Sequence, residues 1–289
     1  MKTIKSDGRS SLFSHEYGFV LFQILLFSLG SSFLSRSGGH NVKNAREMMV
    51  DPRYFAAPIS DIFFAHVASS LYEVIMEVGP EHQCDWIFGW GDHARDDQII
   101  SQDQTKSLID MLWEDRVDFM RAMSSTFTPG LAALSFLNWR YTRLNHKSSR
   151  PNHDLLKRTS EIHWHCALIT GSSQDSLVME ITDQFCILAN LVPAKGKSMF
   201  QRSEGGRAIL EAYISRLTPT NLAMYRPLPI TMLPMVLELI VPNLETGVDD
   251  LLPSLLKVTL DRLWEVLREE KFTYNPLLAC IGLTLEQIR

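Results

Sequence analysis

The sequence has few cysteines, and none of them forms a paired motif. Cys84, Cys166, Cys186 and Cys280 lie far apart in the 289-residue chain, and no two of them make a Cys-x-x-Cys pair. No asparagine begins an Asn-x-Ser/Thr acceptor site for glycosylation either. Disulfides and glycans belong to oxidising, extracellular compartments, so both absences favour an intracellular setting, either cytoplasmic or nuclear.

The chain also lacks an excess of positive charge. It carries 28 basic and 33 acidic residues, which gives a formal net charge of −5. A protein that binds nucleic acid without sequence preference needs a positive field, so we expect no nucleic-acid partner. The hydrophobic content of 45% is enough to fill a large core and indicates a globular chain.

Strand patterns are missing as well. From Ile59 onward, apolar residues recur at spacings of three and four, and each such segment ends in glycine, proline or polar residues. This predicts an all-α fold of stacked antiparallel helices, either an α-solenoid shaped like HEAT or armadillo repeats or an irregular helical bundle. No fixed repeat period is present. We expect residues 1–58 to form an apolar segment with a linker, and residues 59–289 to form one helical domain.

Local signals place the ends of the predicted helices. We expect Ser60 or Asp61 to cap the first helix, Asp154 to cap the fourth, and Pro234 to kink the seventh. The nine expected helices cover residues 59–78, 105–123, 131–144, 154–170, 172–192, 206–217, 230–241, 248–270 and 275–287.

The longest apolar run lies near the start of the chain. Residues 19–34 follow Lys2, Lys5 and Arg9, which is the charge layout of a signal peptide or a signal anchor. The run is short for a span of about 20 residues, and Gln23 lies near its centre. Two interpretations stay open: the segment targets or anchors the protein to a membrane, or it is a helix packed on the body or an extension.

A small set of basic and aromatic residues forms a candidate binding surface. The basic members are predicted to lie at the end of a helix and in the loop after it, where a solvated helix end would explain them equally well. The aromatic members belong to an irregular stretch over residues 81–104. The candidates are Trp86, Trp90, Arg140, Arg143, Lys147 and Arg150.

The same irregular stretch holds a candidate metal site. Asp92, Asp96 and Asp97 resemble the aspartate-rich motif with which helical terpene cyclases hold Mg²⁺. The second metal motif of those enzymes, an Asn-x-x-x-Ser-x-x-x-Glu run, is absent, and the aspartate spacing differs too. A charged, solvated loop is the competing interpretation.

A second set of metal donors lies in residues 161–166, which read EIHWHC. Glu161 and His165 are four residues apart and share a helix face, whereas His163 points roughly 200° away from His165. Zinc would need further ligands from elsewhere, and no second pair at metal spacing is present. In the competing interpretation, these histidines cap the helix or satisfy one of its faces and bind no metal.

No catalytic pattern in the sequence is complete. Gly196-Lys197-Ser198 resembles the end of a phosphate-binding loop, but Leu191 stands where that loop needs its first glycine. We therefore predict a non-enzymatic helical scaffold or protein-interaction domain that binds another protein and uses no cofactor. The alternatives are a metal-dependent helical enzyme acting in an apolar cavity, and a helical component anchored to a membrane through residues 19–34.

Overall fold

The computed structural model of the protein is all-α in the part that it describes. The described residues are 11–37, 59–78, 84–91, 98–124, 130–146, 152–190, 205–218, 228, 233–244 and 247–268. They contain helices and no strand, so the predicted fold class is confirmed, while the solenoid shape stays a prediction. Contacts divide the chain into two compact units, Met1–Phe185 and Cys186–Arg289. The single domain over residues 59–289 stays a prediction.

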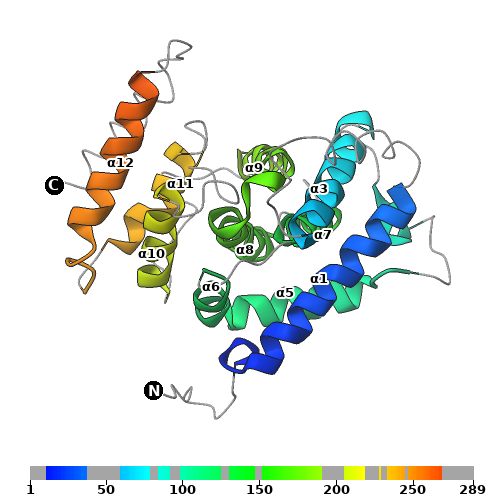
Figure 1. Ribbon diagram of the computed structural model, residues 1–289. Helices are drawn as coiled ribbons and strands as arrows, with labels where there is room; N and C mark the ends of the chain where they lie inside the picture. Colours follow the sequence, from blue (N-terminus) through cyan, green and yellow to red (C-terminus); the bar gives the residue numbers. More distant parts are fainter. Residues whose placement is uncertain are drawn as a thin grey trace. The chain divides into compact units, whose positions relative to one another are not determined.

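Unit 1 contains the helices from η1 to α8 and most of α9 (Figure 1). In chain order they are η1 (Leu12–Ser14), α1 (Glu16–Ser37), α3 (Ile59–Val78), α4 (Asp85–Phe88), α5 (Gln102–Glu114), α6 (Arg116–Ser124), α7 (Leu131–Asn145), α8 (His153–Ile169), η4 (Ser172–Gln174) and α9 (Asp175–Asn190).

Helix α7 lies at the centre of unit 1. Every residue from Leu131 to Thr142 is buried, and α7 contacts α1, α3, α5 and α8. The helix starts after Gly130, whose φ of 95° is in the left-handed region that favours glycine. A Cβ at this position would approach the Phe64 ring to 2.5 Å, so the close contact between the start of α7 and α3 requires a glycine.

Aromatic side chains join α1 to this core. Phe33 of α1 makes edge-to-face contacts with Phe88 and Phe136, with ring centroids 5.4 and 5.8 Å apart. Near the other end of α1, Phe22 contacts Phe119 of α6 in the same way, at 5.7 Å. Such pairs contribute beyond the area they bury. The inner face of α1 is therefore an integral part of the unit 1 core.

The predicted helix over residues 105–123 is wrong as a single helix. It is two helices, α5 and α6, separated at Asp115, whose carboxylate accepts a hydrogen bond of 2.9 Å from the backbone nitrogen of Leu12. Helix α5 also begins earlier than predicted. Ser101 and Gln104 form a capping box, in which each side chain accepts a hydrogen bond from the other residue's backbone nitrogen.

Two predicted N-caps also differ from the structure. Asn152, not Asp154, caps α8, because its side-chain oxygen accepts a hydrogen bond of 3.0 Å from the Leu155 nitrogen. Helix α3 already begins at Ile59, so Ser60 and Asp61 lie in its first turn. The predicted bounds of α3 over residues 59–78 are confirmed.

The described part of unit 2 contains the last residues of α9, followed by α10 (Gly206–Leu217), α11 (Leu233–Ile240), η5 (Val241–Asn243) and α12 (Leu252–Leu267). Helix α10 contacts both α11 and α12, and the hydroxyls of Tyr213 and Thr259 lie 2.8 Å apart between α10 and α12. The predicted kink at Pro234 stays a prediction, because α11 is described from Leu233 and residues 230–232, on the other side of such a kink, lie outside the described residues. The helix predicted over residues 275–287 lies outside the described residues.

A buried ion pair fixes α4 against α7. The Arg140 guanidinium donates two hydrogen bonds of 2.8 Å, from Nε and Nη2, to the two carboxylate oxygens of Asp85. Both side chains are almost completely buried. Removing one partner of such a pair leaves the other as an uncompensated buried charge, which is costly.

We predict that Arg140→Met lowers the free energy of unfolding by about 3–5 kcal/mol, because it leaves the Asp85 carboxylate unpaired in the core. The double variant Asp85→Leu/Arg140→Met should recover most of that loss. Arg121→Met is the matched control, since its partner Asp118 is 3.0 Å away in an exposed pair and the expected loss is below about 1 kcal/mol. Urea unfolding followed by circular dichroism measures all three, and equal losses for Arg140→Met and Arg121→Met would contradict the interpretation.

Candidate functional site

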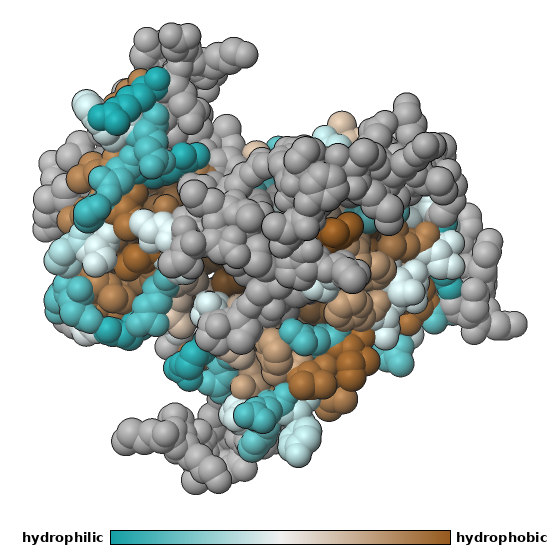
Figure 2. Space-filling view, viewed as in Figure 1, coloured by the Kyte–Doolittle hydropathy of each residue, from teal (hydrophilic) through white to brown (hydrophobic). Residues whose placement is uncertain are grey.

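The outer face of α1 is apolar and exposed. The helix has no charged residue between Glu16 and Arg36, and Figure 2 shows apolar residues gathered over the N-terminal part of α1. Leu21 is 60% exposed and Tyr17 is 83% exposed. The large exposed apolar side chains of α1 are Tyr17, Val20, Leu21, Ile24 and Phe27.

This outer face lies opposite the face that packs in the core. The buried residues Phe22, Leu26, Leu29 and Phe33 recur at spacings of three and four, and the exposed set does so on the other side of the helix. A helix that is apolar all round is normally covered on all sides. The described residues of unit 1 cover α1 on one side, and on the other side its apolar side chains are exposed.

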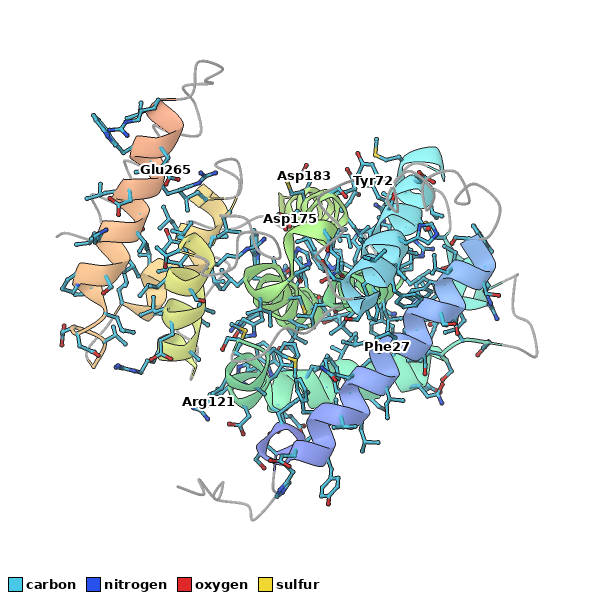
Figure 3. The ribbon with its side chains drawn as sticks, viewed as in Figure 1. Phe27, Tyr72, Arg121, Asp175, Asp183 and Glu265 are labelled. Atoms are coloured by element: carbon cyan, nitrogen blue, oxygen red, sulfur yellow. The ribbon has the colours of Figure 1, made fainter. Side chains whose placement is uncertain are left out.

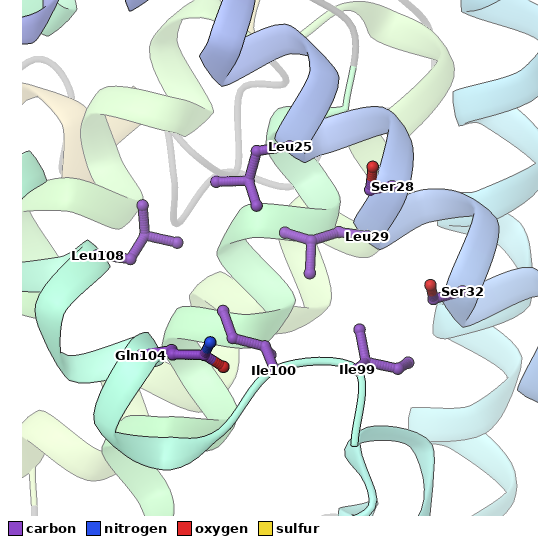
Figure 4. A pocket seen from close by; sticks show the side chains of 8 residues that line it. All are labelled: Leu25, Ser28, Leu29, Ser32, Ile99, Ile100, Gln104 and Leu108. Carbon is purple, nitrogen blue, oxygen red and sulfur yellow. The ribbon is translucent and has the colours of Figure 1, made fainter. Parts of the chain in front are cut away.

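A groove lies beside the outer face, between α1 and α5 (Figure 4). Its volume of about 310 Å³ is near the lower end of the range for ligand-binding pockets. The wall is mostly apolar, with two serines of α1 and one glutamine of α5 as its polar groups. The lining residues are Leu25, Ser28, Leu29, Ser32, Ile99, Ile100, Gln104 and Leu108.

Hydrogen bonds hold the wall of the groove in place. The Trp90 indole nitrogen donates a hydrogen bond of 2.6 Å to the backbone oxygen of Ile100, which positions residues 99–100. The capping box fixes Gln104, whose side-chain oxygen accepts from Ser101. On the other side of α1, the Phe27 ring stacks on Phe63 of α3 with centroids 5.6 Å apart. Phe27, labelled in Figure 3, thus marks the border of the apolar face.

Two of the predicted surface residues are buried. Trp90 stacks on Phe88 with ring centroids 4.3 Å apart, and Arg140 forms the ion pair with Asp85. Both residues are at most 5% exposed. Contrary to the prediction, neither belongs to an exposed binding surface, because each one forms internal contacts that exclude water.

The other four surface candidates are either half-buried or outside the described residues. Trp86 is half-buried in α4. Arg143 is also half-buried, and its Nη1 donates a hydrogen bond of 2.9 Å to the side-chain oxygen of Gln184. Lys147 and Arg150 lie outside the described residues. The structure therefore brings no basic patch together from this set within the ranges that it describes.

The aspartate-rich candidate metal site cannot be placed. Asp92, Asp96 and Asp97 all fall in residues 92–97, which lie outside the described part of the chain. Their assignment to a metal site stays a prediction.

The second candidate metal set is buried in α8. Glu161 is paired with Arg116 of α6, with 3.5 Å between the carboxylate oxygen and Nε. The His163 Nε2 atom lies 2.8 Å from the Thr182 hydroxyl of α9, whereas His165 lies within the electrostatic influence of Arg116. The two histidines therefore interact with different neighbours. Among the described residues, no group of three or more histidine, cysteine, aspartate or glutamate side chains could hold a metal ion.

Burial keeps these two histidines neutral. It lowers the pKa of His163 and of His165 from 6.5 to about 3, and Arg116 adds to the effect at His165. Within the described residues, neither ring nitrogen of His165 has a hydrogen-bond partner. A neutral, enclosed ring is a packing element of α8.

We predict that unfolding becomes easier as the pH falls from about 6.5 toward about 3. The unfolded chain binds protons at His163 and His165 in this window while the folded protein does not, so each ring contributes a slope of up to about 1.4 kcal/mol per pH unit. His165→Leu should remove its share of the slope, as measured by urea unfolding at pH 7, 6 and 5. Leu168→Ala in the same helix should lower stability equally at each pH, and a His165→Leu slope equal to that of the natural protein would contradict the assignment.

The site that the described residues support is therefore the apolar outer face of α1 with its adjoining groove. Sequence analysis did not identify it as a docking surface, although the absence of charge over two faces of one helix was a signal for it. No protein-family model matches the chain, and comparisons with curated proteins and with solved structures found no match.

Proposed function

We propose that the protein is a helical interaction module that binds an apolar helical segment of a partner protein. The binding surface is the outer face of α1 together with the groove between α1 and α5. The observation that supports this most strongly is that α1 is apolar on both faces, while the described residues cover only one of them. Large apolar patches on a folded surface mark sites of interaction.

The spacing of the exposed residues suits a helical ligand. Tyr17, Leu21, Ile24 and Phe27 recur at intervals of four, three and three residues, which is the pattern of anchors in helix-in-groove recognition. The stripe extends over about 15 Å at 1.5 Å per residue, so it matches about three turns of a partner helix. Burying each large apolar side chain contributes about 1.5–3 kcal/mol before the cost of association is subtracted.

The C-terminal half of the surface is lined by small polar residues. Ser28 and Ser32 border the groove, and Ser31 is exposed beside them. Their small side chains permit close approach of a second helix, and their hydroxyls can bond to polar groups on it. The surface thus combines an apolar part that supplies affinity with a serine part that sets the orientation of the ligand.

We predict that a photoreactive residue at position 24 crosslinks to a partner protein in an extract from the native host. The attachment site should map to an apolar helical segment of that partner. Leu21→Asp should abolish the crosslink, because the charge must be buried when the partner docks. Mass spectrometry of the adducts identifies both the protein and the site.

Met76→Asp is the matched control for this experiment. Met76 is an exposed apolar residue of α3 in the same unit, so the variant carries the same change in charge away from the proposed surface. Its crosslinking should equal that of the natural protein. Absence of a protein adduct, or an adduct that persists in Leu21→Asp, would contradict the proposal.

A membrane surface is the second candidate for the apolar face. By length and composition, α1 is the one helix of the described residues that could cross a membrane. Crossing would require withdrawal of Phe22, Leu26, Leu29 and Phe33 from the core, at a cost of about 6–12 kcal/mol, which is comparable to the stability of a whole domain. Docking of the folded unit on a bilayer surface requires no such change. The metal-dependent enzyme stays a prediction, because its aspartates lie outside the described residues.

If the membrane candidate is correct, the purified protein will float with lipid vesicles in a density gradient. Flotation should increase with anionic lipid, since Lys2, Lys5 and Arg9 precede α1 in the sequence. Ile24→Asp should reduce flotation and Met76→Asp should leave it unchanged. Equal flotation of all variants, or none with any vesicle, would exclude α1 as the contact.

A further inference from the structure

Gln104 is held in one orientation at the groove between α1 and α5. Its side-chain oxygen accepts a hydrogen bond of 2.9 Å from the backbone nitrogen of Ser101, and the Ser101 hydroxyl oxygen accepts one of 3.1 Å from the Gln104 backbone nitrogen. A backbone N–H can only donate, so the atom that faces it must be the amide oxygen. This bond therefore fixes which end of the Gln104 amide is the nitrogen.

The nitrogen of this amide is a donor that is presented to the groove. Gln104 lines the groove, and Figure 4 shows its nitrogen on the side of the amide nearer to α1. No described residue accepts a hydrogen bond from that nitrogen. When a ligand displaces water from the groove, the two N–H groups need a new acceptor, because a buried donor without a partner costs free energy.

The α1 side of the groove supplies hydroxyl groups. Ser28 and Ser32 line it there, and each hydroxyl can both donate and accept a hydrogen bond. The other described residues that line the groove are apolar, and none of the lining residues is charged. The polar groups of the groove are therefore one oriented amide donor and two hydroxyls within apolar walls.

These groups discriminate among the side chains that a partner helix could insert. An apolar side chain leaves the Gln104 N–H groups without an acceptor. A carboxylate or an ammonium group would lose its hydration and meet no opposite charge among the lining residues. A carboxamide is neutral, its oxygen can accept from Gln104, and its nitrogen can donate to Ser28 or Ser32. Asparagine and glutamine are the side chains that carry this group.

We propose that the groove receives one asparagine or glutamine side chain of the partner helix, and that Gln104 is the residue that selects it. The inference rests on the function proposed above, because it names the polar residue carried by the apolar helical segment. The apolar side chains of that segment lie on the outer face of α1, while its carboxamide enters the groove.

Peptide selection on the full-length protein tests this proposal. The probe is a phage library of helical peptides of about 14 residues, or four turns, randomised on one face. Peptides selected on the natural protein should carry apolar residues at spacings of three and four, with asparagine or glutamine at one fixed position. Leucine at that position in a synthetic copy should weaken binding about tenfold or more, as measured by fluorescence anisotropy, because it leaves the Gln104 donor unpaired.

Gln104→Glu separates the donor from the capping role of this residue. The glutamate keeps an oxygen for the Ser101 nitrogen, so α5 keeps its capping box, but a second oxygen replaces the amide nitrogen. Binding of the selected carboxamide peptides should fall about tenfold or more. Gln102→Glu is the matched control, because Gln102 is exposed at the start of the same helix and does not line the groove. It should leave binding unchanged, and both variants should unfold in urea as the natural protein does.

The outcomes separate this proposal from the function on which it rests. Selected apolar helices that lose binding in Leu21→Asp but show no preference for asparagine or glutamine would overturn the groove proposal and leave the helix-binding function intact. Equal binding of the carboxamide peptides to Gln104→Glu and to the natural protein would overturn it too. If no selected peptide depends on Leu21, the function proposed for α1 is contradicted, and the groove proposal with it.

Discussion

The Arg140 guanidinium donates two hydrogen bonds to the Asp85 carboxylate inside unit 1, and much of the candidate site depends on that pair. Helix α7 is buried on every side, so its polar side chains must find internal partners. Asn138 donates to the Thr159 oxygen of α8, and Arg140 binds Asp85 at the start of α4. The ion pair therefore orients the short helix that precedes Trp90.

Trp90 links the ion pair to the groove through two hydrogen bonds. Its backbone nitrogen donates to the Asp85 oxygen, and its indole nitrogen donates to the Ile100 oxygen. Ile100 forms part of the groove wall opposite α1. A buried charge on α7 thus helps to position the apolar wall of the groove through a chain of directed hydrogen bonds. The residues first considered as surface contacts, Trp90 and Arg140, support the groove from within.

The sequence was sufficient where local rules decide the structure. The bounds of α3 and α10 follow from apolar spacing and flanking stop residues, and both agree with the structure. The sequence was not sufficient where contacts between residues distant in the chain determine the structure. The break between α5 and α6 coincides with a hydrogen bond that the backbone nitrogen of Leu12 donates to Asp115, 103 residues away, and the burial of Arg140 depends on a partner 55 residues away. The groove is assembled from residues 25–32 and 99–108, so neither segment alone indicates it.

The central claim is that the outer face of α1 is covered by a protein in its native setting. Hydroxyl-radical footprinting compares the oxidation of Tyr17 and Phe27 in the purified protein with their oxidation in a native extract cleared of membranes. Met76 on α3 provides the internal reference. The account predicts that oxidation of Tyr17 and Phe27 falls severalfold in the extract while that of Met76 stays constant. Equal oxidation of all three residues in both samples would contradict it.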